Sequence, residues 1–239
     1  MSMRFWLIIP AAGVGSRMQA SCPKQYLQVA GKSILEHTLE IFLRHPQLQQ
    51  IVLPLAAHDR WWQHCALAGD PQITLVEGGG ERADSVLAGL RALPALGAAA
   101  DDWVLVHDAA RPLLQQDDLQ LLLDSLQDDP VGGLLACQAR DTLKLADVDG
   151  RVESTLPRER IWHALTPQMF RLQALTDALD SALAQGATIT DEASAMEWRG
   201  LSPRLVPGRS DNIKITRPED LQLLSVLQQA AGDQVPADA

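Results

Sequence analysis

Several features that mark whole classes of protein are scarce in this sequence. Its 239 residues include only three cysteines, Cys22, Cys65 and Cys137, which lie far apart. An odd number at such spacing fits neither a disulfide framework nor a CxxC metal site, so we expect a reducing, cytoplasmic environment. No apolar run approaches the roughly 20 residues that a membrane-spanning helix needs, so we expect no membrane partner.

Positive charge is also scarce. The chain has 20 Lys and Arg against 30 Asp and Glu, a net charge of −10. A surface that binds nucleic acid needs a clustered excess of positive charge, so we expect no nucleic-acid partner. Only four lysines occur, Lys24, Lys32, Lys144 and Lys214, which makes a lysine beside a polar motif informative.

The sequence does contain short apolar runs that alternate with segments of helical periodicity. The helical spacing i, i+3, i+4, i+7 occurs within 35–42, 83–90 and 119–126. The apolar runs predict buried parallel strands at Trp6–Ile9, Ile51–Leu55, Ile73–Val76, Trp103–Val106, Leu134–Gln138, Arg204–Val206 and Asn212–Ile215. This order predicts an α/β protein with a mostly parallel sheet flanked by helices. We expect a single domain over 1–231 and a disordered tail at 232–239.

One segment departs from this alternation. From Leu143 to Thr155, apolar residues occupy alternate positions around Asp149-Gly150, which predicts a β-hairpin. The hairpin lies between two core elements, so we expect it to project as an arm over residues 139–161. A projecting hairpin cannot bury both faces alone, which predicts a homodimer formed by pairing with the same arm of a second chain. The side chains that this pairing would bury are Leu143, Leu145, Val148 and Val152.

The first candidate site is the segment Pro10–Met18, which follows the first expected strand. Its glycines can bring backbone N–H groups close to phosphate oxygens, and Arg17 and Lys24 add positive charge. The GxGxxG pattern fails at Met18, and a P-loop is excluded by Tyr26. An ordinary strand-to-helix turn is the alternative interpretation.

The second candidate site is Gly78-Gly79-Gly80 with Ser85. The glycines permit flat approach of a ligand ring, and Ser85 can hydrogen-bond it near a helix N-terminus. A flexible loop is the alternative interpretation.

The third candidate site is His107–Pro112, at the carboxyl end of a strand, where open α/β sheets bind their ligands. Asp108 can hold Mg²⁺ or a ligand hydroxyl, and Arg111 can pair with phosphate or brace the loop. We expect His107 to be a hydrogen-bonded structural residue, and no zinc site, because no second His or Cys stands at ligand spacing.

A fourth, dispersed set consists of polar segments at element boundaries: Thr166–Gln168, Thr188–Ser194 and Asp211–Thr216. Helix capping is the alternative interpretation for each. It is strongest for Thr216, because Glu219 follows three residues later and Pro218 stands in the first turn. Lys214, at the end of a late expected strand, is a candidate phosphate ligand.

Together and in this order, these segments resemble the 2-C-methyl-D-erythritol 4-phosphate cytidylyltransferases of the non-mevalonate isoprenoid pathway. The matching stretches are PAAGVGSRM, CPKQY, ERADSVLAGL, VHDAARP, WHALTPQ, ATITDEASAMEW and DNIKITRPED. The resemblance implies a Rossmann-like fold and a homodimer. It also implies transfer of CMP from CTP to methylerythritol phosphate, giving 4-diphosphocytidyl-2-C-methyl-D-erythritol and pyrophosphate, with Mg²⁺ as the divalent cation. The alternatives are a cytidylyltransferase for another polyol phosphate, such as ribitol 5-phosphate, or a non-catalytic nucleotide-binding protein.

The resemblance also implies roles by position. Arg17 and Lys24 would stabilise the pentavalent α-phosphate, and Arg158 and Lys214 would complete the catalytic set. The nucleotide would be held by Pro10, Ala11, Ala12, Gly13, Gly15, Gly79, Gly80, Ser85 and Ala109. The methylerythritol phosphate would be held by Asp108, Arg111, Thr142, Thr190 and Thr216, with Thr142 and Arg158 coming from the partner's arm. Mg²⁺ would bind Asp108 or otherwise the CTP phosphates. The family often has an acidic residue where Gly80 stands, which leaves side-chain recognition of the base open here.

The residue types suit this chemistry. A phosphate monoester has a second pKa of about 6, so the nucleophile is already largely ionised near neutral pH. No general base is required, and the motifs offer no Ser-His or Cys-His pair. The reaction instead needs relief of repulsion between two anions, which fixed cations and Mg²⁺ supply.

Overall fold

The structure is a computed structural model that describes residues 3–13 and 22–232. Gly15, Arg17 and residues 233–239 of the expected tail lie outside the described residues. Gly232, which we expected to belong to the tail, is instead the last residue of helix α6 (Pro218–Gly232). Within the described part of the chain, no helix combines the length and the apolar character needed to cross a membrane.

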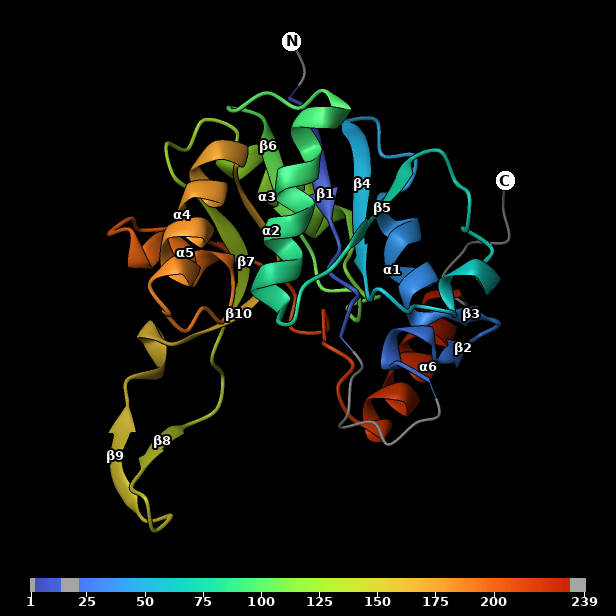
Figure 1. The fold of residues 1–239 in the computed structure, drawn as a ribbon. Coiled ribbons are helices and arrows are strands. Elements are labelled where there is room, and N and C mark those ends of the chain that lie inside the picture. The colour runs from blue at the N-terminus through green and yellow to red at the C-terminus, as the bar shows by residue number, and fades with distance from the viewer. Residues whose placement is uncertain (1–2, 14–21, 233–239) are drawn as a thin grey trace.

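A seven-stranded sheet forms the centre of the molecule, in the order β11-β7-β10-β6-β1-β4-β5 (Figure 1). Its strands are β1 (Phe5–Ile8), β4 (Leu48–Leu55), β5 (Ile73–Glu77), β6 (Trp103–Val106), β7 (Gly132–Gln138), β10 (Trp162–Arg171) and β11 (Arg204–Pro207). Strand β10 runs antiparallel to its neighbours β6 and β7, and the other pairs are parallel. The prediction of a mostly parallel α/β sheet is confirmed.

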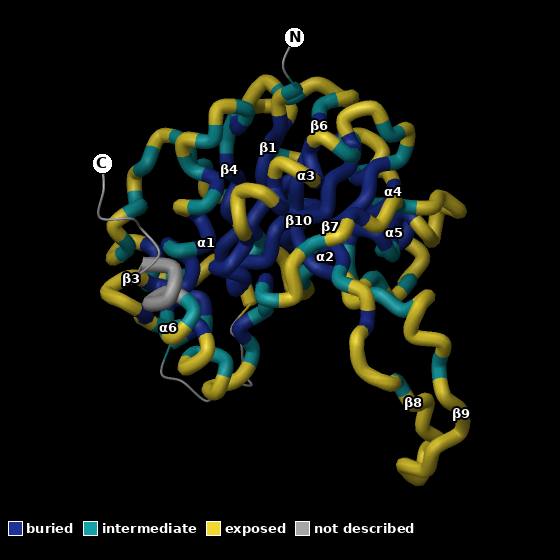
Figure 2. Tube along the Cα trace, turned by 180° about the vertical axis from the view of Figure 1, so that it is seen from behind, coloured by how far each residue is buried: buried dark blue, intermediate teal, exposed yellow. Residues whose placement is uncertain are grey.

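Helices cover both faces of this sheet, which is why its central strands are apolar on both sides. Along β1, Phe5 and Leu7 pack with α1 (Ile34–Phe42) and α3 (Gln116–Leu126). Trp6 and Ile8 point to the opposite face, toward the other helices. Those helices are α2 (Arg82–Ala92), α4 (Leu172–Ala184) and α5 (Glu192–Trp198). Figure 2 shows the resulting buried centre.

Short elements complete the chain. A small hairpin of β2 (Gln28–Val29) and β3 (Lys32–Ser33) precedes α1. Its Val29 packs with Leu224 of α6 and with Ile215, so α6 closes a third apolar cluster. Among the described residues, the 3-10 helices are η2 (Lys24–Tyr26), η3 (Trp62–His64), η4 (Leu93–Leu96) and η5 (Arg158–Arg160). The three predicted helical segments are confirmed as α1, α2 and α3.

The structure corrects the expected strands in two places. Asn212–Ile215 forms no strand: its Ile215 N–H donates to Ala110 O at 2.8 Å, which is a loop contact outside any ladder. The other error is an omission, because β10 was not expected. Its ladder with β7 is interrupted between Ala164 and Gln168, around Pro167, which has no N–H to donate.

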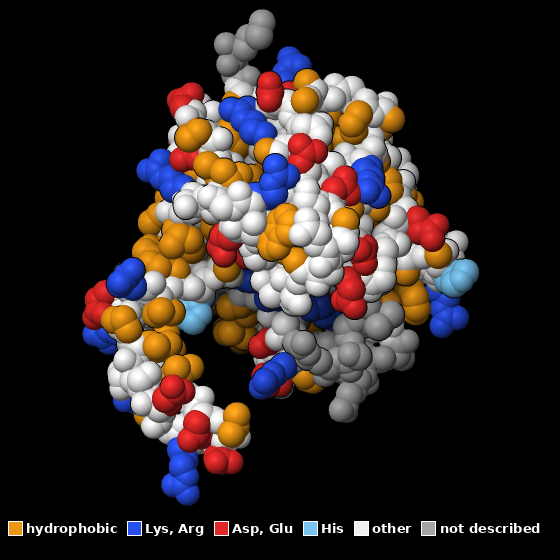
Figure 3. Space-filling model, turned by 60° about the vertical axis from the view of Figure 1, so that its left-hand side comes forward, with side chains coloured by type: hydrophobic (Ala, Val, Ile, Leu, Met, Phe, Trp, Pro, Cys, Tyr) orange, Lys and Arg blue, Asp and Glu red, His pale blue; other side chains and the backbone are white. Residues whose placement is uncertain are grey.

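The predicted hairpin is confirmed. Strands β8 (Leu143–Ala146) and β9 (Val152–Leu156) pair antiparallel, and Gly150 in the turn has φ +77°, a conformation that favours glycine. Leu145 is 44% exposed and Val148 is 102% exposed. The arm, residues 139–161, projects from one end of the molecule in Figures 1 and 2. Figure 3 shows hydrophobic side chains along it, and a hollow between the arm and the rest of the molecule.

Candidate active site

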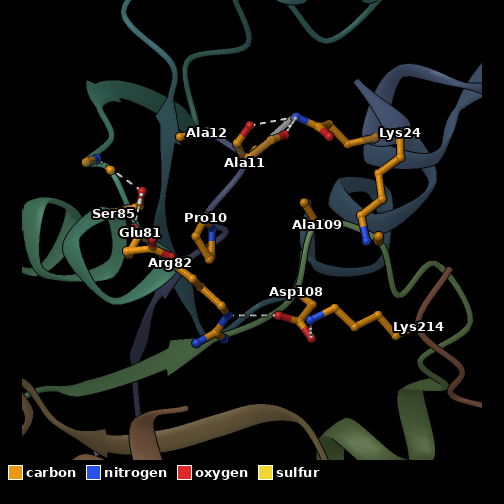
Figure 4. A pocket seen from close by; sticks show the side chains of 15 residues that line it. Pro10, Ala11, Ala12, Lys24, Glu81, Arg82, Ser85, Asp108, Ala109 and Lys214 are labelled. Carbon is orange, nitrogen blue, oxygen red and sulfur yellow. Dashed lines mark hydrogen bonds and ion pairs between the residues drawn. The ribbon is translucent and has the colours of Figure 1, made fainter. Parts of the chain in front are cut away.

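A cavity of about 260 Å³ lies at the carboxyl ends of β1, β5 and β6. Ligands of open α/β sheets bind at this edge. The cavity, which we call the first cavity, is lined by Pro10, Ala11, Ala12, Gly13, Lys24, Gln25, Gly79, Gly80, Glu81, Arg82, Ser85, Asp108, Ala109, Ala110 and Lys214. Figure 4 shows the residues that line it, which come from the loops after β1, β5 and β6, from the start of α2, from η2 and from the segment that carries Lys214. All of the described residues predicted to bind the nucleotide are therefore brought together.

The loop after β1 continues the strand direction and is tied to the segment that carries Lys24. Ala11 N–H donates to Pro54 O at 2.9 Å. The buried Gln25 amide donates to Ala11 O at 2.7 Å and to Gly13 O at 3.1 Å. Lys24 Nζ donates to Ile215 O at 2.9 Å, so Lys24 also links this loop to the segment that carries Lys214.

Two of the three glycines after β5 are required by close packing. A Cβ on Gly78 would lie 2.6 Å from Ala12 Cβ, and a Cβ on Gly79 would collide with Asp84. Ser85 Oγ accepts a hydrogen bond from Gly79 N–H at 3.1 Å. A Cβ on Gly80 would meet only the Asp84 carboxylate, at 3.9 Å. Gly78 thus lets this loop pack against the first one and Gly79 lets it pack against the start of α2, whereas Gly80 leaves space at the cavity.

The carboxylate of Asp108 contacts three cationic side chains of the site. Its Oδ1 accepts a hydrogen bond from Arg82 Nε at 3.1 Å. Its Oδ2 accepts from Arg111 Nε at 3.1 Å and lies 3.0 Å from Lys214 Nζ. Burial opposes ionisation of this carboxyl, but Arg82, Lys214 and Arg111 outweigh it and hold the pKa of Asp108 far below its ordinary value. Asp108 is therefore a carboxylate at any pH near neutrality.

His107 is a structural residue, as predicted. Its imidazole is fully buried and lies 3.0 Å from Thr166 Oγ1 and 3.0 Å from Arg111 O. Burial lowers the pKa of His107 to about 4. The ring is therefore neutral at physiological pH, and both of its nitrogens are engaged in positioning the loop around Asp108.

A second cavity, of about 250 Å³, adjoins the first. Its walls are Arg82, Asp108, Arg111, Ala164, Leu165, Thr166, Gln168, Thr190, Asp191 and Lys214. Arg82, Asp108 and Lys214 line both cavities, and we call these three residues the boundary cluster. Two adjoining cavities that share a charged wall suit a reaction between two anionic substrates.

Arg82 and Glu192 are central to this arrangement and were missed by the sequence analysis. Arg82 Nη1 donates to Glu192 Oε1 at 2.6 Å, and Nη2 donates to Oε2 at 3.2 Å. Burial disfavours the charged guanidinium, but Glu192 and Asp108 outweigh this and raise the pKa of Arg82 above its ordinary value. The available signal was position, because each residue begins a helix and lies within a segment already identified as a candidate site.

Thr190 and Thr216 have different surroundings. Thr190 lines the second cavity, as expected for a substrate ligand. Thr216 lines neither cavity, and its hydroxyl donates to Asp220 Oδ2 at 3.1 Å. The same carboxylate accepts from the backbone N–H groups of Thr216 and Arg217. The predicted capping partner, Glu219, was therefore wrong by one residue.

The arm residues lie away from both cavities of their own chain. Arg158 is exposed, and its Nη1 donates to Arg140 O at 3.0 Å. Thr142 is also exposed, at the start of the arm. Neither residue lines the first or the second cavity.

The carboxylates here do not form a preformed metal site. Among residues 3–13 and 22–232, no group of three or more His, Cys, Asp or Glu side chains could hold a metal ion. Both oxygens of Asp108, the candidate Mg²⁺ ligand, are engaged by cationic side chains. Asp108 therefore does not fit direct metal coordination in this arrangement.

Comparison with known proteins identifies the family. The model of the family described as IspD, 2-C-methyl-D-erythritol 4-phosphate cytidylyltransferase, matches residues 5–229. The chain belongs to this family. It is therefore a cytidylyltransferase, and the resemblance found in the sequence motifs is confirmed.

Individual relatives agree along nearly the whole chain. The 2-C-methyl-D-erythritol 4-phosphate cytidylyltransferase of Ectopseudomonas mendocina is 64% identical, covering 94% of this chain and 95% of its own. That of Pseudomonas fluorescens SBW25 is 63% identical, covering 92% and 94%. The crystal structure of the Francisella tularensis enzyme of the same name superposes with a TM-score of 0.81 at 35% identity, covering 93% of this chain and 99% of that one.

Proposed function

We propose that the two cavities hold the two substrates of the family reaction, with CTP in the first and methylerythritol phosphate in the second. The reaction transfers CMP from CTP to the phosphate of 2-C-methyl-D-erythritol 4-phosphate, giving 4-diphosphocytidyl-2-C-methyl-D-erythritol and pyrophosphate. The observation that carries this assignment is the boundary cluster, which lines both cavities where the two phosphates have to meet.

In the nucleotide half of the site, the loop after β1 presents mainly backbone, because Pro10, Ala11, Ala12 and Gly13 carry no polar side chain. The segment from Pro10 to Gly13, with Gly15 further along, would hold the triphosphate through its N–H groups. Cytidine would lie against the loop of Gly79 and Gly80, with Ser85 and Ala109. These proposals are supported by the packing that brings Gly78 against Ala12.

Cationic side chains would stabilise the transition state of cytidylyl transfer. Lys24 and Arg17 are proposed to stabilise the charge that develops at the α-phosphate. No general base is needed, because the attacking phosphate is already largely ionised near its second pKa of about 6. His107 is unsuited to that role, since it is neutral, fully buried and engaged at both nitrogens.

The second substrate would be held by Lys214, Arg111 and Thr190, with Asp108 accepting from its hydroxyl groups. Lys214 is the natural phosphate ligand of the set, because its side chain is partly exposed and faces both cavities. Thr216 would join this set when its hydroxyl exchanges Asp220 for the substrate.

Mg²⁺ is proposed to enter with the nucleotide, bound to the CTP phosphates. It would neutralise phosphate charge, while the protein supplies Lys24 and the backbone N–H groups of the first loop. This proposal leaves Asp108 with its cationic partners.

A homodimer is proposed to complete each site. The arm exposes Leu145 and Val148, and a two-stranded hairpin of this kind is marginally stable on its own. Pairing of two arms under twofold symmetry would cover these side chains and deliver Thr142 and Arg158 to the partner's second cavity. The free cysteines support action in the reducing cytoplasm.

The test is a turnover assay with a panel of nucleoside triphosphates and polyol phosphates. We expect pyrophosphate release with CTP and methylerythritol phosphate, and little with ribitol 5-phosphate or with other triphosphates. Preference for ribitol 5-phosphate would contradict the substrate assignment. CTP binding without any turnover would instead identify a non-catalytic nucleotide-binding protein.

A further inference from the structure

The side chains of Glu192 and Arg82 join two helices across the site. Glu192 begins α5 and Arg82 begins α2, and the two residues are 110 positions apart in the chain. Glu192 is only 1% exposed, and both of its carboxylate oxygens accept from the Arg82 guanidinium. A two-point contact between a planar guanidinium and a carboxylate fixes orientation as well as distance.

The remaining contact of this guanidinium is to Asp108. A guanidinium has five N–H donors, and here Nε serves Asp108 while Nη1 and Nη2 serve Glu192. Arg82 is thus held between two carboxylates. Glu192 sets the plane of the guanidinium, and that plane sets where Asp108 Oδ1 is held.

Fixing Oδ1 also fixes the other oxygen of Asp108. Oδ2 faces Arg111 and Lys214, whose amino group lies 3.0 Å away. The placement of Lys214 between the two cavities therefore depends on a chain of contacts that begins at Glu192. Glu192 itself lines neither cavity, so it can act only through its neighbours.

The same link holds the wall of the second cavity. Thr190 and Asp191 line that cavity directly before Glu192. Gln168 of β10 holds the start of α5 against the sheet. Its Nε2 donates to Asp191 Oδ2 at 2.9 Å, and its Oε1 accepts from Ala193 N–H at 2.8 Å. The contact from Arg82 adds a second attachment, from the helix that borders the first cavity.

We propose that Glu192 is a positioning residue for cytidylyl transfer, which acts through Arg82 to hold Asp108 and Lys214 in register between the two substrates. This inference rests on the proposed assignment of substrates to the two cavities. Without the Glu192 charge, Arg82 would be drawn to Asp108 alone and would compete with Lys214 for it. Small misplacements of reacting groups reduce turnover strongly, by about 10²-fold for roughly 1 Å.

The first test compares Glu192→Gln with Glu197→Gln. Glu197 lies on the same helix but is exposed, so it is a matched control for loss of one carboxylate. We expect Glu192→Gln to lower kcat by about 10- to 100-fold, because Asp108 and Lys214 lose their register between the substrates. The KM values for CTP and methylerythritol phosphate should stay within about threefold, because the cations that attract both substrates remain, and Glu197→Gln should match the parent chain.

A second variant separates positioning from folding. Arg82→Lys keeps the positive charge, but a single ammonium group cannot reproduce the fork that contacts both carboxylates. It should lower kcat as Glu192→Gln does, and the double variant should be no slower than the slower single variant, because both changes break one chain of contacts. Thermal unfolding of each variant checks that the assay temperature lies below its transition.

The outcomes are distinct. If the parent chain turns over while Glu192→Gln behaves like Glu197→Gln, the positioning role is wrong and the proposed function stands. Additive losses in the double variant, or failure of both single variants to fold, would also overturn it in favour of independent or purely structural roles. A parent chain with no activity toward CTP and any polyol phosphate overturns the proposed function and this inference together.

Discussion

The boundary cluster and the arm differ in how far one chain can complete them. In the boundary cluster, both oxygens of Asp108 have partners from the same chain, and the carboxylate is almost fully buried. In the arm, Val148 is fully exposed and β8 pairs only with β9 among the described strands. The first region is preorganised by one fold, whereas the second has apolar surface that its own chain does not cover.

This difference separates two kinds of contribution to catalysis. Charged groups held in a buried network need no reorganisation when the transition state forms, which is the source of large rate effects. Residues on a marginally stable hairpin can be placed with similar accuracy only when another surface holds them. The site and the arm should therefore respond differently to substitution.

The largest effect is expected for Lys24 in the first cavity. If Lys24 stabilises charge that develops only in the transition state, Lys24→Ala should lower kcat by about 10²–10³-fold while CTP affinity changes little. Steady-state kinetics and calorimetry with CTP measure the two quantities. Lys32→Ala is the control, since Lys32 is exposed and pairs with Glu40. Unchanged kcat with weak CTP binding would assign Lys24 to ground-state binding.

The next effect concerns the stability of the loop around Asp108. The unfolded chain binds a proton on His107 below pH about 6.5, whereas the folded chain does so only below pH about 4. The unfolded state therefore binds more protons in this window, and lowering the pH through it should remove about 3 kcal/mol from the free energy of unfolding. Above pH about 6.5 this contribution is fully present.

Chemical denaturation between pH 4 and 7 measures this loss. His107→Gln cannot be protonated, so its stability should depend much less on pH in that window. A residual dependence of stability on pH should remain in this variant, because burial also lowers the pKa of His45. His64→Gln, at an exposed position, should keep the full dependence. Equal slopes for His107→Gln and the parent chain would show that His107 does not titrate in this way.

The arm and the boundary cluster also differ in what could be predicted from the sequence. The arm follows from local features, namely alternating apolar residues and Asp149-Gly150 at the turn, and both act within a few residues. The contact between Arg82 and Glu192 spans 110 positions and leaves no local pattern. Loop motifs beside strand ends indicated the first cavity, but the tertiary fold decides which charged side chains meet there.

The wrong strand at Asn212–Ile215 has a similar cause. Ile215 is fully buried and Ile213 is partly buried against the cluster of Val29 and Leu224, and apolar residues at this spacing give the same sequence pattern in an extended loop as in a strand. In β10, by contrast, Pro167 and the polar residues beside it conceal a strand. The ladder interruption there places Thr166 and Gln168 at the second cavity.

A mixing experiment, with a smaller expected change in activity, tests whether the arm contributes residues to the partner's active site. Dimers mixed from Arg158→Ala and Lys24→Ala chains should contain one site with both lesions and one with neither. We expect purified hybrids to recover about half of the activity of the parent dimer, because each active site would borrow Arg158 from the other chain. Each variant alone should remain nearly inactive. Hybrids without activity would show that Arg158 serves its own subunit.

The smallest effect on the free energy of unfolding is expected for Leu145→Ala in the arm. The same substitution in the core, Leu105→Ala, serves as the comparison. Leu105 of β6 is fully buried, so Leu105→Ala should cost about 2–5 kcal/mol of unfolding free energy. Leu145 of β8 is 44% exposed, so Leu145→Ala should cost less than about 1 kcal/mol in dilute, monomeric protein.

Protein concentration sharpens this last comparison. If the arms pair, unfolding of the parent chain should shift to higher denaturant as concentration rises, because dimerisation stabilises only the folded state. Leu145→Ala should reduce that shift and lower the dimer fraction in sedimentation velocity, whereas Leu105→Ala should cost about the same at every concentration at which the folded dimer persists. A parent chain that is monomeric and insensitive to concentration would show that Leu145 and its neighbours stay exposed, and that each site is complete within one chain.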